Sequence, residues 1–354
     1  MKSKGFFIAA LACILACFAA LSTLVIVEDP FFVFNGVAEG EKAHFSNQRY
    51  EMGGLIRHQE YSSVIMGTSL AANYRASWFT EGLGEKTLKI TFPDGWISEF
   101  DTALRLAYRV KGELDTVCFS LDPNIITRPD SRRTVELPDY PYNLNPLDDV
   151  EYLLNADTYR LMGRSWLKGA EGAVVLDEAY VWDGSYTFSY SNALGGYPRP
   201  AISGTALPAD AYLEAAEENL DVVCSWVEEH PDTRFKIWFP PYSILYWDKS
   251  IREGTAEAVL AAVEYAGQRL LAYDNVELYS FLQDYEVITD LNNYTDHIHC
   301  SGGVTYYVAQ SVMGGAAPMT AETLHEELAQ LRQFVIDYDY TAIFPEEQTK
   351  LPAA

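Results

Sequence analysis

The sequence is poor in cysteine, in basic residues and in long apolar runs, and each shortage excludes a class of protein. Five cysteines in 354 residues are too few for a disulfide framework. Twenty-five basic residues face 50 acidic ones, so the formal net charge is −25 at pH 7. Such a chain repels phosphate backbones and anionic lipids, so we expect neither nucleic-acid binding nor adhesion of the main domain to an anionic membrane surface. A single long apolar run excludes a polytopic membrane protein.

Apolar and aromatic residues are abundant, at 49% and 14% of the chain. Disordered chains lack this much apolar surface, so the sequence predicts a folded protein. The length suits one large domain or two small ones and can enclose a sizeable core.

The one long apolar run covers residues 6–27. As a helix it reaches about 33 Å, which is enough to cross the hydrocarbon of a bilayer. Lys2 and Lys4 precede it and acidic residues follow it, so the remaining chain is expected on the extracytoplasmic face of the cell membrane. Residues 1–28 are therefore interpreted as an uncleaved signal anchor. The alternative is a cleaved signal peptide with a small-x-small site at Ala20-Leu21-Ser22.

Five short apolar runs bounded by turn-forming residues predict β-strands. They cover residues 63–67, 88–92, 116–121, 235–239 and 276–279. Amphipathic periods at 101–111, 209–229 and 255–272 predict helices between them. This alternation favours an α/β fold, with a five-stranded parallel sheet of flavodoxin-like order in a three-layer α/β/α sandwich. Active sites on such sheets lie at the carboxyl ends of the strands.

The domain expected after the anchor is residues 29–344, with an insertion at about 123–205 and a tail at 345–354. Within the insertion, residues 146–168 are predicted to be helical, with Pro146 in the first turn. Residues 180–197 are rich in tyrosine and tryptophan. We interpret them as a small core beneath the insertion; the alternative is a surface that stacks on sugars.

Two polar clusters follow predicted strands. Ser69 comes directly after the first strand and before a probable helix, where a serine can be a nucleophile or an N-terminal cap. Asp296 and His299 follow the last strand, three residues apart. A carboxylate there can fix the tautomer of the imidazole, whose other nitrogen then faces a nucleophile. Alone, the second cluster is also compatible with half a metal site or with a hydrogen-bonded turn.

Taken together, these clusters resemble the blocks of the SGNH/GDSL hydrolase superfamily, and in particular its membrane-anchored, exported envelope proteins. The first block is Met66-Gly67-Thr68-Ser69, with threonine where aspartate is usual, and the second is Asp296-His297-Ile298-His299. The resemblance implies a catalytic set of Ser69, His299 and Asp296, with Gly95 in the oxyanion hole. It implies no cofactor and no metal.

The oxyanion hole departs from the family pattern. Asp122 stands where the family carries an asparagine that donates to the oxyanion, and an ionised carboxylate cannot donate. Asn124, two residues further on, is the alternative donor. Losing one such donor costs about 100–1000-fold in rate, so Asp122 bears directly on whether the site is active.

The resemblance leads to three functional hypotheses. The first is an esterase or O-acyltransferase that acts on acyl groups of a cell-wall polymer or exopolysaccharide. The second is a catalytically silent domain that binds or positions an envelope glycan or a partner protein. The third is an accessory protein for D-alanylation of teichoic acid, which a surface at −25 would repel unless arginines such as Arg128 make the cleft basic. The sequence predicts no oligomeric state.

Overall fold

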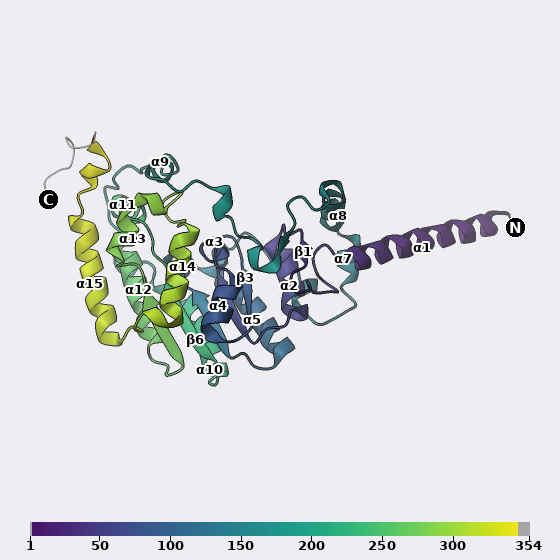
Figure 1. Ribbon diagram of the computed structural model, residues 1–354, viewed down its shortest axis with the longest axis horizontal. Coiled ribbons are helices and arrows are strands. Elements are labelled where there is room, and N and C mark those ends of the chain that lie inside the picture. Colours follow the sequence, from purple (N-terminus) through teal and green to yellow (C-terminus); the bar gives the residue numbers. More distant parts are fainter. Residues whose placement is uncertain (1, 346–354) are drawn as a thin grey trace. The chain divides into compact units, whose positions relative to one another are not determined.

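The computed structural model describes residues 2–345 (Figure 1), so the expected tail lies outside the described residues apart from Pro345. The chain divides into two compact units. The first unit comprises Met1–Tyr61, Thr102–Gly112 and Val135–Tyr180, and the second comprises Ser62–Asp101, Glu113–Thr134 and Val181–Ala354. The segment expected as one insertion is thus shared, because residues 135–180 pack with the N-terminal residues and residues 181–205 pack with the sheet.

The second unit is built on a parallel five-stranded sheet in the order β3-β2-β4-β6-β7. Its strands are β2 (Ser63–Gly67), β3 (Thr87–Thr91), β4 (Thr116–Ser120), β6 (Arg234–Phe239) and β7 (Val276–Ser280). All five predicted strands are confirmed to within one residue at each end. The three central strands are buried along almost their whole length, which explains why they read as continuous apolar runs.

Helices follow the strands of this unit, as the amphipathic periods predict. They are α3 (Ser69–Ala72), α4 (Ala76–Leu83), α5 (Ile97–Lys111, which continues into the first unit), α6 (Pro123–Ile126), α9 (Tyr190–Gly195), α10 (Leu213–Glu229), α11 (Ile244–Glu253), α12 (Ala256–Leu270), α13 (Tyr285–Thr289), α14 (Gly302–Gln310) and α15 (Ala321–Asp337). Aromatic rings join helices to the sheet. Phe119 of β4 contacts Phe100 and Trp226, and Trp238 of β6 contacts Tyr74 and Phe79.

The first unit begins with the apolar helix α1 (Lys2–Glu28), which is long and apolar enough to cross a membrane as an anchor or to act as a signal sequence. Its other elements are α2 (Gln48–His58), α7 (Val150–Leu154), α8 (Ala156–Lys168) and a two-stranded sheet of β1 (Lys42–Ala43) and β5 (Val174–Val175). The last turns of α1 belong to the folded core, because Val25 is fully buried against Phe31, Tyr152 and Leu161.

The single helix predicted over residues 146–168 is wrong in its start and its continuity. The structure has α7 and α8, with the break at Asn155 and Pro146 outside both. Asn155 is extended, with φ −71° and ψ 123°, and its side chain accepts a hydrogen bond from the amide of Asp157. Asparagine is a strong N-terminal cap, so it ends one helix and starts the next despite the continuous apolar period.

Candidate functional site

Polar residues gather at the carboxyl ends of the parallel strands in the second unit. Ser69 follows β2, Asp122 follows β4, and the loop that carries Asp296 and His299 follows β7. A cavity of about 160 Å³ opens between these ends. Its lining consists of Thr68, Ser69, Leu70, Asp94, Asp122, Asn124, Ile125, Arg128, Tyr242, Ile298 and His299. This is the edge where ligands bind in open α/β sheets.

The hydroxyl of Ser69 is available for chemistry because another residue caps its helix. Thr68 is the N-cap of α3, and its Oγ1 accepts from the amide of Leu70. Ser69 Oγ instead lies 2.9 Å from Nε2 of His299. The approach of α3 to the sheet is tight at Gly67, where an added Cβ would lie 2.6 Å from Ala71 Cβ and 3.0 Å from Ser120 Cβ. Glycine therefore brings the serine turn close to β4.

Asp296 holds His299 through both its side chain and its backbone. Its Oδ2 lies 2.7 Å from Nδ1 of His299, and its Oδ1 accepts the backbone amides of Ile298 and His299 at 2.8 Å each. Burial alone raises the pKa of this carboxyl, but the bonds from His299 and the two amides outweigh burial and lower the pKa to about 2. Asp296 is therefore ionised at neutral pH and directs the Nδ1 proton of His299 toward itself.

Asp122 accepts hydrogen bonds rather than facing the cavity freely. Its Oδ2 accepts from Thr68 Oγ1 at 2.5 Å and its Oδ1 accepts from Tyr242 Oη at 3.1 Å. Desolvation by burial raises the pKa of Asp122 to about 6, although both hydrogen bonds oppose this shift. Thr68 thus has a definite partner in Asp122, which the sequence alone did not reveal.

The two other predicted oxyanion donors differ in their surroundings. The amide of Gly95 donates to the carbonyl of Phe92 at 3.0 Å, so it is engaged in a turn. Asn124 lines the cavity, and its Oδ1 accepts a 3.5 Å bond from Tyr246, which leaves the amide nitrogen as the donating end of the side chain. Asp94 beside Gly95 has a φ of 50°, a backbone conformation that is uncommon outside glycine.

Arg128 does not give the cavity a free positive charge. Its guanidinium pairs with Asp94, donates to the carbonyl of Gly95 at 2.7 Å and lies 4.1 Å from the ring centre of Trp96. Arg133, in the same loop, lies 3.9 Å from Asp130. Nearby acidic side chains therefore offset the charge of these two arginines.

Sequence reasoning missed the role of Asn73 and left that of Trp182 open. Asn73 is buried, and its Oδ1 accepts the backbone amides of Trp182 and Asp183 at 2.9 and 3.0 Å. Trp182 donates from Nε1 to the carbonyl of Ser69 at 3.0 Å, and its ring lies edge-on to His299 at 5.3 Å. The aromatic segment therefore adjoins the serine and histidine. The available signals were the aromatic density at 180–197 and the asparagine four residues after Ser69.

Two neighbours of His299 have other surroundings. His297 packs against Tyr197 with ring centres 6.0 Å apart, and burial lowers its pKa. Cys300 is buried, and desolvation raises the pKa of its thiol to about 12, so it is not a thiolate at neutral pH. Within residues 2–345, no three histidine, cysteine, aspartate or glutamate side chains are grouped to hold a metal ion.

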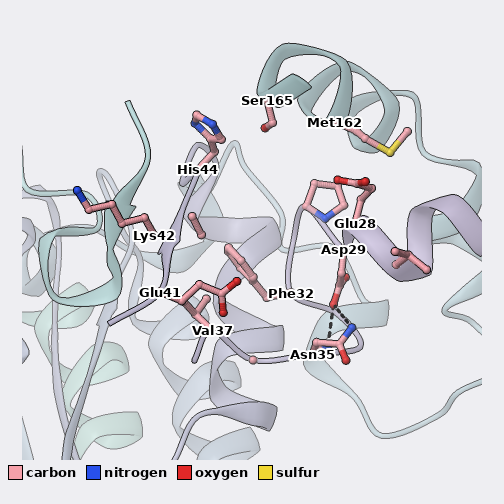
Figure 2. Close-up of a pocket in the computed structure, with 14 residues that line it drawn as sticks. Glu28, Asp29, Phe32, Asn35, Val37, Glu41, Lys42, His44, Met162 and Ser165 are labelled. Carbon is pink, nitrogen blue, oxygen red and sulfur yellow. Dashed lines mark hydrogen bonds between the residues drawn. The ribbon is translucent and has the colours of Figure 1, made fainter. Parts of the chain in front are cut away.

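A larger cavity, of about 420 Å³, lies in the first unit and contains none of the predicted site residues. Figure 2 shows it between the C-terminal end of α1, the β1 strand and α8. Asp29, on its wall, accepts the backbone amides of Val33, Phe34 and Asn35. These bonds fix the turn that follows α1, so we interpret this wall as structural.

No family model, curated protein or solved structure matches this chain. The resemblance to SGNH hydrolases therefore rests on the residues and geometry described above.

Proposed function

We propose that the chain is an SGNH-like serine esterase or O-acyltransferase, with a three-layer α/β/α fold, that acts on acyl groups of a cell-envelope glycopolymer. The observation that carries the proposal is the hydrogen-bonded series of Ser69, His299 and Asp296. Its two distances, 2.9 and 2.7 Å, lie in the range needed for proton transfer. The nucleophile follows β2, and the base and its orienting carboxylate share the loop after β7, so all three groups lie at the carboxyl edge of the sheet where active sites of such folds are found.

The mechanism follows from these contacts. Ser69 Oγ attacks the acyl carbon while its proton passes to Nε2 of His299, and the tetrahedral intermediate collapses to an ester on Ser69. The leaving hydroxyl takes the proton back from His299. Water or a sugar hydroxyl then attacks the acyl-serine with His299 again as base, which gives hydrolysis or transfer. Asp296 stays ionised and stabilises the imidazolium in both steps.

The developing oxyanion needs donors, and Asn124 is the strongest candidate because it lines the same cavity as Ser69 and its side chain has an amide nitrogen that can donate. The backbone N–H of Ser69, in the first turn of α3, is the second candidate. Gly95 is a weaker candidate than the resemblance implies, since its amide is bound to Phe92.

Two features support a short acyl group on a sugar. The cavity of about 160 Å³ is smaller than the roughly 300–1,000 Å³ typical of pockets for drug-sized ligands. Beside it, Trp182 contacts Tyr186 and Phe188 at 5.5 and 6.0 Å. Tyr186 is 58% exposed, so its ring is available to stack on a pyranose.

The proposed location is the extracytoplasmic face of the cell membrane, with α1 as a single-pass anchor. Its support is the apolar length of α1 together with Lys4 before the run and Glu28 after it.

The proposal is tested by treating the full-length protein with a fluorophosphonate probe, which labels activated serines. We expect labelling in the wild type and at most about a hundredth of it in Ser69→Ala and His299→Ala, because the activated nucleophile or its base is lost. His297→Asn is the matched control, since this neighbouring histidine faces Tyr197, and it should label normally. A folded wild type that stays unlabelled contradicts the enzyme hypothesis.

A specific observation favours the silent glycan-binding domain as the second candidate. Asp122 accepts from Thr68 and Tyr242 where the family places a donor. If the wild type is unlabelled but Asp122→Asn gains labelling, the natural site lacks only its oxyanion donor. Glycan binding without labelling in either protein would support the silent domain.

A further inference from the structure

The last turn of α8 is an exposed apolar and basic surface. Leu167 is 91% exposed and Trp166 is 53% exposed, and the charged side chains of Arg164 and Lys168 lie beside them in the helix, both exposed. Two adjacent large apolar side chains with this exposure form a contiguous patch, and such patches mark sites of contact with another protein or with a membrane. We call Arg164, Trp166, Leu167 and Lys168 the α8 surface.

The α8 surface lies close to the place where α1 leaves the folded unit. Leu161 of α8 packs in the same core cluster as Val25 of α1. Met162 and Ser165 line one cavity together with Val27 and Glu28, and Figure 2 shows the Met162 side chain beside Glu28. Figure 1 shows α7 and α8 at the C-terminal end of α1. Trp166 and Leu167 directly follow Ser165, so they lie near this end as well.

The chemistry of the α8 surface differs from that of the whole chain. Helix α8 contains Arg160, Arg164 and Lys168 against the single acidic Asp157, whereas the protein has twice as many acidic as basic residues. Tryptophan and leucine beside basic residues are typical of helices that lie at the boundary of lipid headgroups and acyl chains. The net negative charge of the protein argues against contact with an anionic membrane in general, but α8 itself has more basic than acidic residues, so this argument does not exclude contact through α8.

We propose that the α8 surface docks on the same lipid bilayer that α1 enters, with Trp166 and Leu167 in the headgroup boundary and Arg164 and Lys168 on anionic lipid. This inference rests on the proposed anchoring by α1. A bilayer is the occupant that the structure favours over a second copy of the chain, because α1 itself exposes apolar side chains along nearly its whole length. The lipid that covers α1 is therefore within reach of α8. Docking would give the first unit a second hold on the membrane beside α1.

The test uses the full-length protein in nanodiscs of phosphatidylcholine and phosphatidylglycerol. An environment-sensitive fluorophore is attached at Leu167→Cys after Cys13 and Cys17 are replaced by alanine; the other three cysteines are buried. We expect quenching by doxyl-labelled lipid at least about twice that of the same probe at Ile336→Cys, together with weak quenching by aqueous iodide. Ile336 is the matched control because it is a half-exposed apolar residue on a helix of the second unit.

Three outcomes overturn the proposal and differ from one another. Strong iodide quenching with lipid quenching equal to that at Ile336 means that the α8 surface faces water. Shielding from both quenchers means that a second protein copy covers it. In a separate variant that keeps Cys17 and has Cys13 replaced by alanine, a probe on Cys17 that lipid does not quench means that α1 is not in the bilayer, so anchoring itself fails.

The electrostatic part of the proposal has its own test. Reversal of both charges, with Arg164→Glu and Lys168→Glu, should lower lipid quenching at Leu167→Cys by about half or more in anionic nanodiscs, and by less in neutral ones. Gln330→Glu on α15 is the control for added negative charge. Equal quenching with and without the reversal would overturn the role of anionic lipid.

Discussion

Asp122 differs from the other carboxylates near Ser69 because burial removes it almost completely from water. Asp94, on the same cavity, has an exposed side chain, and Asp296 is held ionised by three hydrogen bonds. Asp122 has two donors, Thr68 and Tyr242, and they do not offset the cost of its desolvation. A buried carboxyl with these partners therefore lowers the stability of the folded protein when it is ionised.

The stability cost of Asp122 depends on pH in a definite direction. Its folded-state pKa of about 6 lies above the value of about 3.9 in an unfolded chain, so the folded state binds the proton more tightly. Stability is therefore lost as the pH rises from about 4 to about 6, by about 3 kcal/mol in full. We expect Asp122→Asn to lack this loss and to gain stability relative to the wild type over that range. Thermal unfolding at several pH values measures it.

The matched control for this prediction is Asp94→Asn, which changes the same chemical group on the same cavity at an exposed position. If the stabilities of Asp122→Asn and the wild type change in parallel between pH 4 and 7, the pKa of Asp122 is not raised by burial, and this prediction is wrong.

At this scale the sequence indicated the types of residue in the site but not all of their contacts. Ser69, Asp296 and His299 could be grouped because each follows a strand of a parallel sheet, and those ends meet. The bond of Thr68 to Asp122 and the bonds of Asn73 to residues 182–183 join segments 54 and about 110 residues apart. Short-range periodicity contains no information on such pairs.

Among the elements, α1 is apolar enough to cross a membrane, yet its C-terminal end packs into the core of the first unit. Val25 is fully buried, while Val27, two residues later, is 72% exposed. We expect Val25→Ala to destabilise the first unit by about 2 kcal/mol, because two buried methyl groups are lost. The matched control Val27→Ala should change stability by less than about 0.5 kcal/mol. Denaturation of the full-length protein in detergent micelles measures the free energy of unfolding of both variants. Equal effects of the two substitutions would mean that Val25 does not pack in the core of the first unit.

The aromatic segment between β5 and α9 is held at the site by the bonds of its backbone to Asn73 and by the side chain of Trp182, which contacts Ser69 and His299. If its exposed face binds sugar, Tyr186→Ala should raise KM for an acylated oligosaccharide by about 5–10-fold, from the loss of roughly 1–1.5 kcal/mol of stacking. The kcat, and turnover of a small acyl ester without sugar, should be unchanged. Tyr190→Ala, a second exposed tyrosine in the next helix, is the control. An equal effect on both substrates would place Tyr186 in the folding of the site instead.

Element prediction succeeded where one local signal dominated. The five strands are short apolar runs between turn formers, and α5, α10 and α12 have clear 3.6-residue periods. The strands β1 and β5 have two residues each, which is too short for any period. Residues 135–180 fold with the N-terminal residues because of contacts with α1 and α2, and the order of the chain does not indicate that association.

For the molecule as a whole, the dominant property is its net charge of −25. This charge favours a neutral glycan over a polyanionic polymer as the substrate, because it repels phosphate groups. The arginines near the site do not reverse it, since Arg128 pairs with Asp94 and Arg133 lies near Asp130. Two esters of one acyl group, one neutral and one bearing phosphates, should therefore differ in their salt dependence. Screening lengths fall from about 30 Å at 10 mM salt to about 8 Å at 150 mM.

We expect kcat/KM for the phosphate-bearing ester to rise several-fold over that interval, because salt weakens the repulsion that slows its approach, while the neutral ester stays constant. If the protein does not turn over, the same comparison applies to binding affinity. A phosphate-bearing ester that reacts faster at low salt would mean that the cleft is locally positive despite the total charge. That result would favour teichoic acid over a neutral glycan as the substrate, since attraction at low ionic strength is the signature of a polyanionic ligand in a complementary site.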